Sequence, residues 1–112
     1  MRALPPLICE RLFQQVVADG EAKTFRVVWM QPVATENDWS CEYVIEWPDR
    51  PRRSRRIMGV DSVQALLLAM KSASAELYDA EPQVFWWDPD DILDLPILSS
   101  VTDLEAARTR GR

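Results

Sequence analysis

Seven carboxylates and no lysine or arginine lie between residues 76 and 94 of this 112-residue chain. Clustered carboxylates can bind a hard cation or act as an acid–base pair. However, the stretch DPDDILD (88–94) lacks the glycine and the terminal glutamate of an EF-hand loop. A solvated acidic loop is therefore favoured over a metal-binding or catalytic site built from residues 88–94. The seven carboxylates are Glu76, Asp79, Glu81, Asp88, Asp90, Asp91 and Asp94.

Two adjacent tryptophans, Trp86 and Trp87, precede this loop. Aromatic anchors beside charged groups are typical of protein-binding surfaces. Because neighbouring residues of a strand face opposite sides, one tryptophan should reach solvent or a partner. We therefore expect a partner-binding surface made of Trp87, Asp88, Asp90, Asp91 and Asp94.

A second charged cluster, RPRRSRR (50–56), contains five arginines. Guanidinium groups bind phosphates and carboxylates, but basic side chains also protect an exposed edge strand from aggregation. The net charge of −5 opposes binding to nucleic acid. Protection of an exposed strand edge is therefore the favoured role of the arginines. Nucleic acid is not an expected partner, and a basic protein suits the acidic chain better. The arginines are Arg50, Arg52, Arg53, Arg55 and Arg56.

The groups that most enzymes depend on are scarce. The chain has no histidine, which removes the commonest general base and metal ligand, and only three glycines, with no phosphate-binding loop. Cys9 and Cys41 are too few for a zinc site or a disulfide framework. A bridge between them needs two strands that set them side by side, and reduced thiols are favoured. We expect no enzymatic activity, no cofactor and no metal site.

The N-terminal residues do not resemble a secretion signal, because Pro5 and Pro6 interrupt the apolar stretch. No segment approaches the roughly 18 apolar residues that a membrane span requires. A cytoplasmic protein without membrane contact is the expectation.

Four strands are predicted before residue 61. Residues 7–17 alternate loosely, which favours a strand over the alternative of a short helix, and Asp19 and Gly20 then give a hairpin signal. TFRVVWMQP (24–32) is rich in β-branched and aromatic residues and ends at a proline. WSCEYVIEW (39–47) alternates cleanly, with Ser40, Glu42 and Glu46 on its wet face. RRSRRIMGV (52–60) follows a turn at PDRP (48–51). The inward residues of 39–47 are Trp39, Cys41, Tyr43, Ile45 and Trp47.

A long helix is predicted to follow. Asp61 is the expected N-cap, and Gln64 can reach back to its amide. The three- and four-residue spacing of apolar side chains predicts a buried stripe, flanked by small residues at 65, 69 and 72. The helix should end at residues 78–80, before Pro82. The stripe consists of Val63, Leu66, Leu67, Met70, Ala73 and Leu77.

After the helix, QVFWWD (83–88) predicts a fifth strand. Residues 98–112 form a polar C-terminal extension, which holds a short helix capped by Thr102 or simply frays. The sequence therefore predicts one α+β domain over residues 1–97. Its architecture is an antiparallel sheet of four to five strands (β-β-β-β-α-β) with one long helix packed on one face.

Three segments resemble a family of small bacterial proteins of unknown function. They are NDWSC (37–41), GVDSVQALLLAM (59–70) and LDLP (93–96), and the likeness covers roughly residues 8–97. The resemblance implies the fold more than the function, because the helix-start motif is structural. The chain departs from the family in its arginine-rich strand and in residues 98–112.

Small acidic proteins of this type also resemble immunity partners of bacterial secreted toxins. We therefore expect a non-catalytic immunity protein that neutralises a cognate toxin by occluding its active site, with a basic toxin domain as partner. The alternative is a small metal- or ligand-binding enzyme subunit that uses the acidic 88–94 loop.

Overall fold

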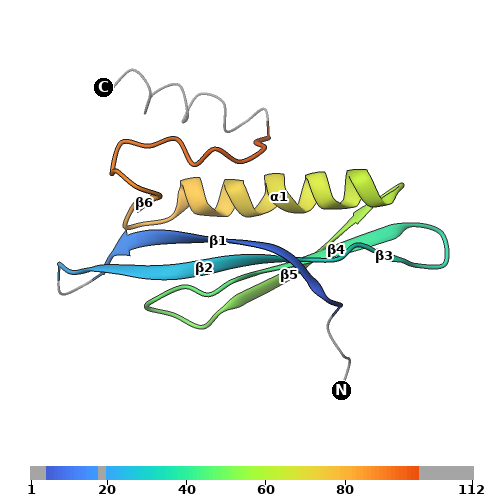
Figure 1. The fold of residues 1–112 in the computed structure, drawn as a ribbon, viewed down its shortest axis with the longest axis horizontal. Coiled ribbons are helices and arrows are strands. Elements are labelled where there is room, and N and C mark those ends of the chain that lie inside the picture. Colours follow the sequence, from blue (N-terminus) through green and yellow to red (C-terminus); the bar gives the residue numbers. More distant parts are fainter. Residues whose placement is uncertain (1–4, 18–19, 99–112) are drawn as a thin grey trace.

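The computed structural model describes residues 5–17 and 20–98 and shows an α+β fold, with one helix packed on one face of an antiparallel sheet (Figure 1). The predicted fold class is confirmed, and β3 is an additional strand of two residues. In chain order the elements are β1 (Leu7–Val16), β2 (Ala22–Met30), β3 (Val33–Ala34), β4 (Trp39–Ile45), β5 (Arg53–Gly59), α1 (Ser62–Asp79) and β6 (Val84–Phe85).

Strand β4 pairs with β5 on one side and with β2 and β3 on the other. Strand β2 continues the sheet to β1, and β1 pairs with the short β6. The arginine-rich β5 is therefore an edge strand, as its composition predicts. The expected hairpin joins β1 to β2, and Gly20 has a positive φ of 81°. Asp19 and the predicted extension after Leu98 lie outside the described residues.

Helix α1 begins and ends where the sequence predicts. The Asp61 carboxylate accepts a hydrogen bond from the Gln64 amide at 2.8 Å. The Gln64 side chain reaches back to the amide of Val60, one residue before the expected one. The helix ends at Asp79, inside the predicted range. This helix is not apolar enough to span a membrane.

The buried stripe predicted for α1 is wrong in part, because Val63 is 72% exposed and Leu67 is also exposed. Leu66 and Met70 are half-buried. The small-residue flank supplies much of the contact with the sheet, since β5 approaches the helix closely. A Cβ atom on Gly59 would lie only 2.4 Å from the Ala65 nitrogen. The helix residues that are fully buried are Ala65, Ala69, Ala73, Ser74 and Leu77.

Strand β4 is buried on both faces, although the sequence predicts one wet face. The inward residues Cys41, Tyr43 and Ile45 lie in the main core, as expected. On the other face Ser40 and Glu42 are also buried, so the prediction of a wet face there is wrong. The reason is a second apolar cluster on that face, formed across β2 and β4 by Val28, Met30 and Val44.

Residues 86–98 complete the cover of the sheet. Helix α1 packs mainly on β4 and β5. The irregular segment runs back along the helix (Figure 1) and places the fully buried Leu93 in the same core as Phe13 of β1. Its position is fixed by hydrogen bonds from the Leu93 amide to Tyr78 Oη and from Arg11 to the Leu93 carbonyl. The acidic loop is therefore also a structural element.

Candidate functional site

Strand β6 ends after two residues, and the backbone amides that follow it form hydrogen bonds with a side chain instead of with β1. The amides of Trp87 and Asp88 both donate to the carboxylate of Asp91, at 2.8 and 2.9 Å. The Asp91 amide donates in turn to the Asp88 carbonyl. The strand predicted over residues 83–88 is therefore only Val84–Phe85, and Asp91 shapes the turn that presents its neighbours.

One of the two tryptophans reaches solvent, as the sequence predicts, but their rings do not face opposite sides. The ring centroids lie 5.7 Å apart, because β6 ends at Phe85 and strand alternation does not extend to Trp86 and Trp87. Trp86 is half-buried under the guanidinium of Arg11, whose Cζ lies 4.1 Å from the ring centroid. Trp87 is 76% exposed, the largest value among the large hydrophobic side chains of the described residues. A large exposed aromatic beside charged groups is typical of a contact surface.

A cleft of about 240 Å³ lies beside Trp87. Leu12, on its wall, is 56% exposed and belongs to the outer face of the sheet, the face opposite α1. Val16, also exposed, shares this face of β1. Trp87 therefore adjoins an apolar strip on the outer face. The lining residues are Leu12, Gln14, Thr24, Trp86 and Trp87.

The five residues expected to bind a partner do not have equal surroundings. Asp88 and Asp90 are exposed in the turn that carries Trp87. Asp94 is exposed further along, has a positive φ of 54°, and its carbonyl accepts a hydrogen bond from Arg11 at 3.1 Å. Leu12 and Gln14 were not among the expected residues. The alternation of β1 indicates that Leu12 and Gln14 share one face of the strand. It does not indicate that this face adjoins Trp87, because that depends on the fold.

Glu76, the first of the seven carboxylates, does not belong to this surface. It accepts a hydrogen bond from Tyr43 Oη and pairs with Arg53 at 2.6 Å, with Arg55 at 4.0 Å. Tyr43 Oη also lies 2.9 Å from Ser72 Oγ. Burial, together with the carboxylate of Glu76, raises the pKa of Tyr43 to about 12. This network ties α1 to β4 and β5.

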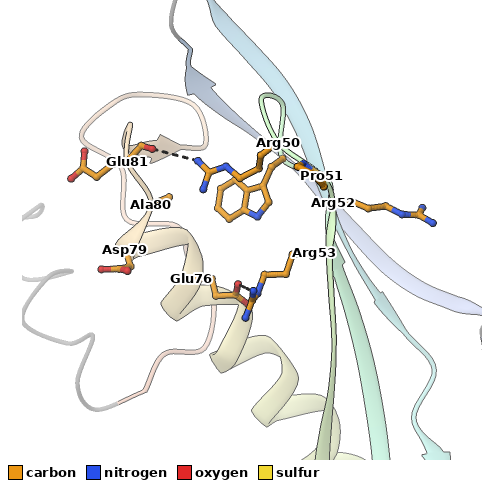
Figure 2. A pocket seen from close by; sticks show the side chains of 9 residues that line it. Arg50, Pro51, Arg52, Arg53, Glu76, Asp79, Ala80 and Glu81 are labelled. Carbon is orange, nitrogen blue, oxygen red and sulfur yellow. Dashed lines mark hydrogen bonds and ion pairs between the residues drawn. The ribbon is translucent and has the colours of Figure 1, made fainter.

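The arginine-rich hairpin and the end of α1 enclose a cleft of about 560 Å³ (Figure 2). Arg50 lies over the ring of Trp47, 4.6 Å from its centroid, and donates to the Glu81 carbonyl. Arg53 faces Glu76, whereas Arg52 points away from the cleft (Figure 2). Arg50 and Arg53 therefore hold the hairpin against the helix. These two arginines have a structural role in addition to the edge protection expected of the cluster.

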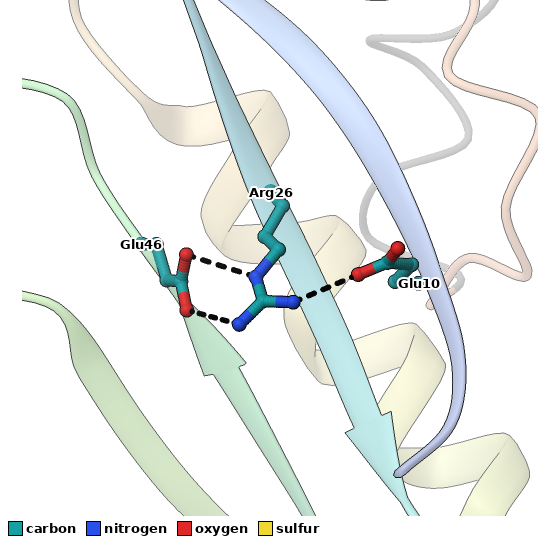
Figure 3. Close-up of polar contacts among 3 residues, drawn as sticks. All are labelled: Glu10, Arg26 and Glu46. Carbon is teal, nitrogen blue, oxygen red and sulfur yellow. Dashed lines mark hydrogen bonds and ion pairs between the residues drawn. The ribbon is translucent and has the colours of Figure 1, made fainter.

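The outer face carries an ion-pair bridge that joins β1, β2 and the residue directly after β4. Arg26 of β2 forms a two-point hydrogen-bonded pair with Glu46 and a third bond with Glu10 of β1, all at 3.0 Å (Figure 3). The hydrogen bonds to Glu46 and then Glu10 raise the pKa of Arg26. Because the three side chains are about one third to one half exposed to solvent, the bridge contributes little stability, but it neutralises Arg26.

The two cysteines are free thiols on the helix side of the sheet. Strand β2 separates them, since Cys9 lies opposite Trp29 and Cys41 belongs to β4, so the geometry required for a bridge is not met. Burial raises the pKa of Cys9 and raises that of Cys41 to about 11. The Cys41 thiol donates to the Met30 carbonyl at 3.3 Å. Both thiols are therefore poor nucleophiles at neutral pH.

Within residues 5–17 and 20–98 no group of three or more acidic, cysteine or histidine side chains is placed to hold a metal ion. The fold and the site thus define an α+β protein with a half-covered sheet and an outward tryptophan beside exposed carboxylates. The chain belongs to the family described as domain of unknown function DUF6968, whose model matches residues 9–97. The resemblance to an uncharacterised family is therefore confirmed. No curated protein and no solved structure matches the chain.

Proposed function

We propose that this chain is a binding protein without catalytic activity, which docks a basic protein through a tryptophan–acid surface. This surface consists of Leu12, Gln14, Trp87, Asp88 and Asp90. The observation that carries the proposal is the exposure of Trp87 beside an apolar cleft and an acidic turn. An aromatic anchor surrounded by polar groups is the common centre of a protein interface.

The charge of the chain supports a basic partner. The net charge is −5, and residues 76–94 contain no basic side chain. Complementary charge speeds encounter and excludes wrong partners more than it adds affinity. The raised pKa values of Cys9 and Cys41 and the lack of histidine favour binding over catalysis.

In its narrower form the proposal is an immunity protein that meets a basic toxin domain in the cytoplasm and neutralises it by covering its active site. The acidic charge and the two free thiols support this form. A reading frame for a large secreted effector beside this one would identify the partner, and co-purification would test the pair.

The test is the rate and affinity of association with that partner. Trp87→Ala should raise Kd by about 30-fold, the loss of about 2 kcal/mol typical of an interface anchor. Asp88→Lys should slow association several-fold at low salt, with the difference vanishing at high salt. Glu36→Lys, the same charge change on the exposed β3–β4 loop, is the matched control and should have little effect.

Two results would contradict the proposal. One is an affinity and salt dependence that neither Trp87→Ala nor Asp88→Lys changes. The other is tight, stoichiometric binding of calcium, magnesium or manganese in a calorimetric titration, which would favour the alternative of a metal-binding enzyme subunit on the 88–94 loop.

A further inference from the structure

The sheet has two long edges, and only one of them carries a cluster of arginines. Strand β5 carries three exposed arginines, which oppose pairing with another chain. On the opposite edge β6 pairs with β1 only at Gln14 and Gln15. In the described part of the chain, β1 has no strand partner on that side from Leu7 to Phe13. This stretch also exposes the apolar side chains of Leu7, Ile8 and Leu12.

The hydrogen-bond pattern shows which backbone groups of β1 are open. The Arg26 carbonyl accepts from the Glu46 amide, so the backbone groups of Arg26 face β4. Leu12 lies opposite Arg26 in the antiparallel pair, and its own N–H and C=O therefore face away from β2. The same holds for Glu10, two residues earlier, whereas Arg11 and Phe13 bond to β2. Among residues 5–17 and 20–98, these groups of Glu10 and Leu12 thus have no strand partner, and both residues are exposed.

The tryptophan–acid surface continues this open edge. Leu12 contributes both an open backbone position and a wall of the Trp87 cleft. The charge beside the edge is acidic, with Glu10 on the strand and Asp88 in the turn. The nearby cations are engaged, since Arg11 binds the Leu93 carbonyl and stacks on Trp86, and Arg26 is shared between Glu10 and Glu46. Two carboxylates face one guanidinium in this trio, so it keeps a net negative charge.

We propose that the open edge of β1 is completed by an extended basic segment of the partner. Its backbone pairs with Glu10 and Leu12, and one apolar side chain enters the Trp87 cleft. This inference rests on the proposed function for the basic protein partner and names how it binds. A second copy of the chain fits less well, because symmetric pairing centred on Glu10 would place two carboxylates opposite each other. Strand addition of this kind obtains affinity from the main chain and specificity from pockets.

The experiment uses a seven-residue peptide of alternating valine and lysine, capped at both ends, and NMR of the full chain. In the free protein the amides of Glu10 and Leu12 should exchange with solvent faster than those of Arg11 and Phe13. Saturating peptide should protect Glu10 and Leu12 and shift their resonances. The matched peptide with glutamate in place of lysine should not bind.

Glu10→Pro removes an outward N–H that β2 does not use, and proline is tolerated on a sheet edge. It should weaken the basic peptide at least tenfold, whereas Glu10→Ala, which keeps the N–H, should weaken it only a few-fold. If the proline variant does not fold, amide hydrogen exchange in the unaltered protein, with and without peptide, still tests the proposal. Amides of Glu10 and Leu12 left unprotected by saturating peptide would overturn the proposal.

Other outcomes separate this inference from the proposed function. Partner binding that is lost in Trp87→Ala but unchanged in Glu10→Pro would overturn strand addition and leave the tryptophan–acid surface standing. Equal binding of the acidic peptide would also overturn it. A dimer in sedimentation that Glu10→Pro abolishes would assign the edge to a second copy of the chain instead.

Discussion

Gly59 ends strand β5 under the first turn of α1, and no side chain fits at this position. An added Cβ would meet backbone atoms of Ala65, which cannot move aside without shifting the helix. Gly59→Ala should therefore lower the free energy of unfolding by at least the roughly 1–3 kcal/mol of an overpacked core. Urea unfolding measures the change.

Gly20→Ala is the control for this prediction. Nothing lies within 4 Å of a Cβ at Gly20, but its φ of 81° disfavours a side chain. The expected cost is about 1–2 kcal/mol, from backbone conformation alone. If Gly59→Ala has no cost, the close contact between β5 and α1 is contradicted.

Tyr43 makes stability depend on alkaline pH. Its pKa in the folded protein is about 12, against an ordinary value of 10. Above pH 10 the unfolded chain therefore loses this proton while the folded protein keeps it. The free energy of unfolding should fall between pH 10 and 12 by roughly 2 kcal/mol on account of this group. Tyr43→Phe should show a shallower fall in the same window, measured by denaturant unfolding at each pH. Equal slopes for the two proteins would contradict the assignment.

At the scale of elements, spacing predicted the existence of helix α1 and its limits, but not the side that it buries. Val63 and Leu67 have the right spacing for a buried stripe, yet they are exposed. Periodicity shows that residues share a face without showing what lies opposite that face. Ala65 and Ala69 meet the sheet because β5 approaches closely at Gly59, a contact between distant segments that local spacing does not encode.

A pair of substitutions tests this assignment. Ala69→Leu should destabilise the protein by roughly 1–3 kcal/mol or more, because Ala69 is fully buried against the sheet. Val63→Ala should change stability by less than about 0.5 kcal/mol, because Val63 is mostly exposed. Thermal unfolding compares them. The opposite order of costs would restore the stripe read from the sequence.

The site shows the same limit of sequence reasoning. The exposure of Trp87 agrees with the prediction that one tryptophan reaches solvent, but strand alternation is not its cause, because β6 ends at Phe85 and the two rings lie 5.7 Å apart. Two other features could not be predicted from the sequence. One is the role of Asp91 in shaping the turn, and the other is that Leu12 and Trp87 line one cleft. Both depend on where β6 ends, which the sequence pattern predicts at residue 88 and the structure places at Phe85.

At the scale of the whole molecule, two different covers share one side of the sheet. Helix α1 lies over β4 and β5, and residues 86–98 pack beside it against β1. The second cover also carries Trp87 and the acidic turn, so the segment that completes the core presents the candidate binding surface. Such an arrangement holds the exposed anchor on a well-packed base, which lowers the cost of ordering it on binding.

If residues 86–98 are part of the core, Leu93 must contribute to stability as a core residue does. Leu93→Ala should lower the free energy of unfolding by about 2–5 kcal/mol, because the side chain is fully buried. Leu98→Ala, at an exposed position of the same segment, should cost less than about 1 kcal/mol and is the matched control. The two are compared by urea unfolding with far-UV circular dichroism. A small and equal loss of unfolding free energy for both variants would mean that the segment is a solvated loop. Residues 86–98 would then not provide a rigid base for Trp87.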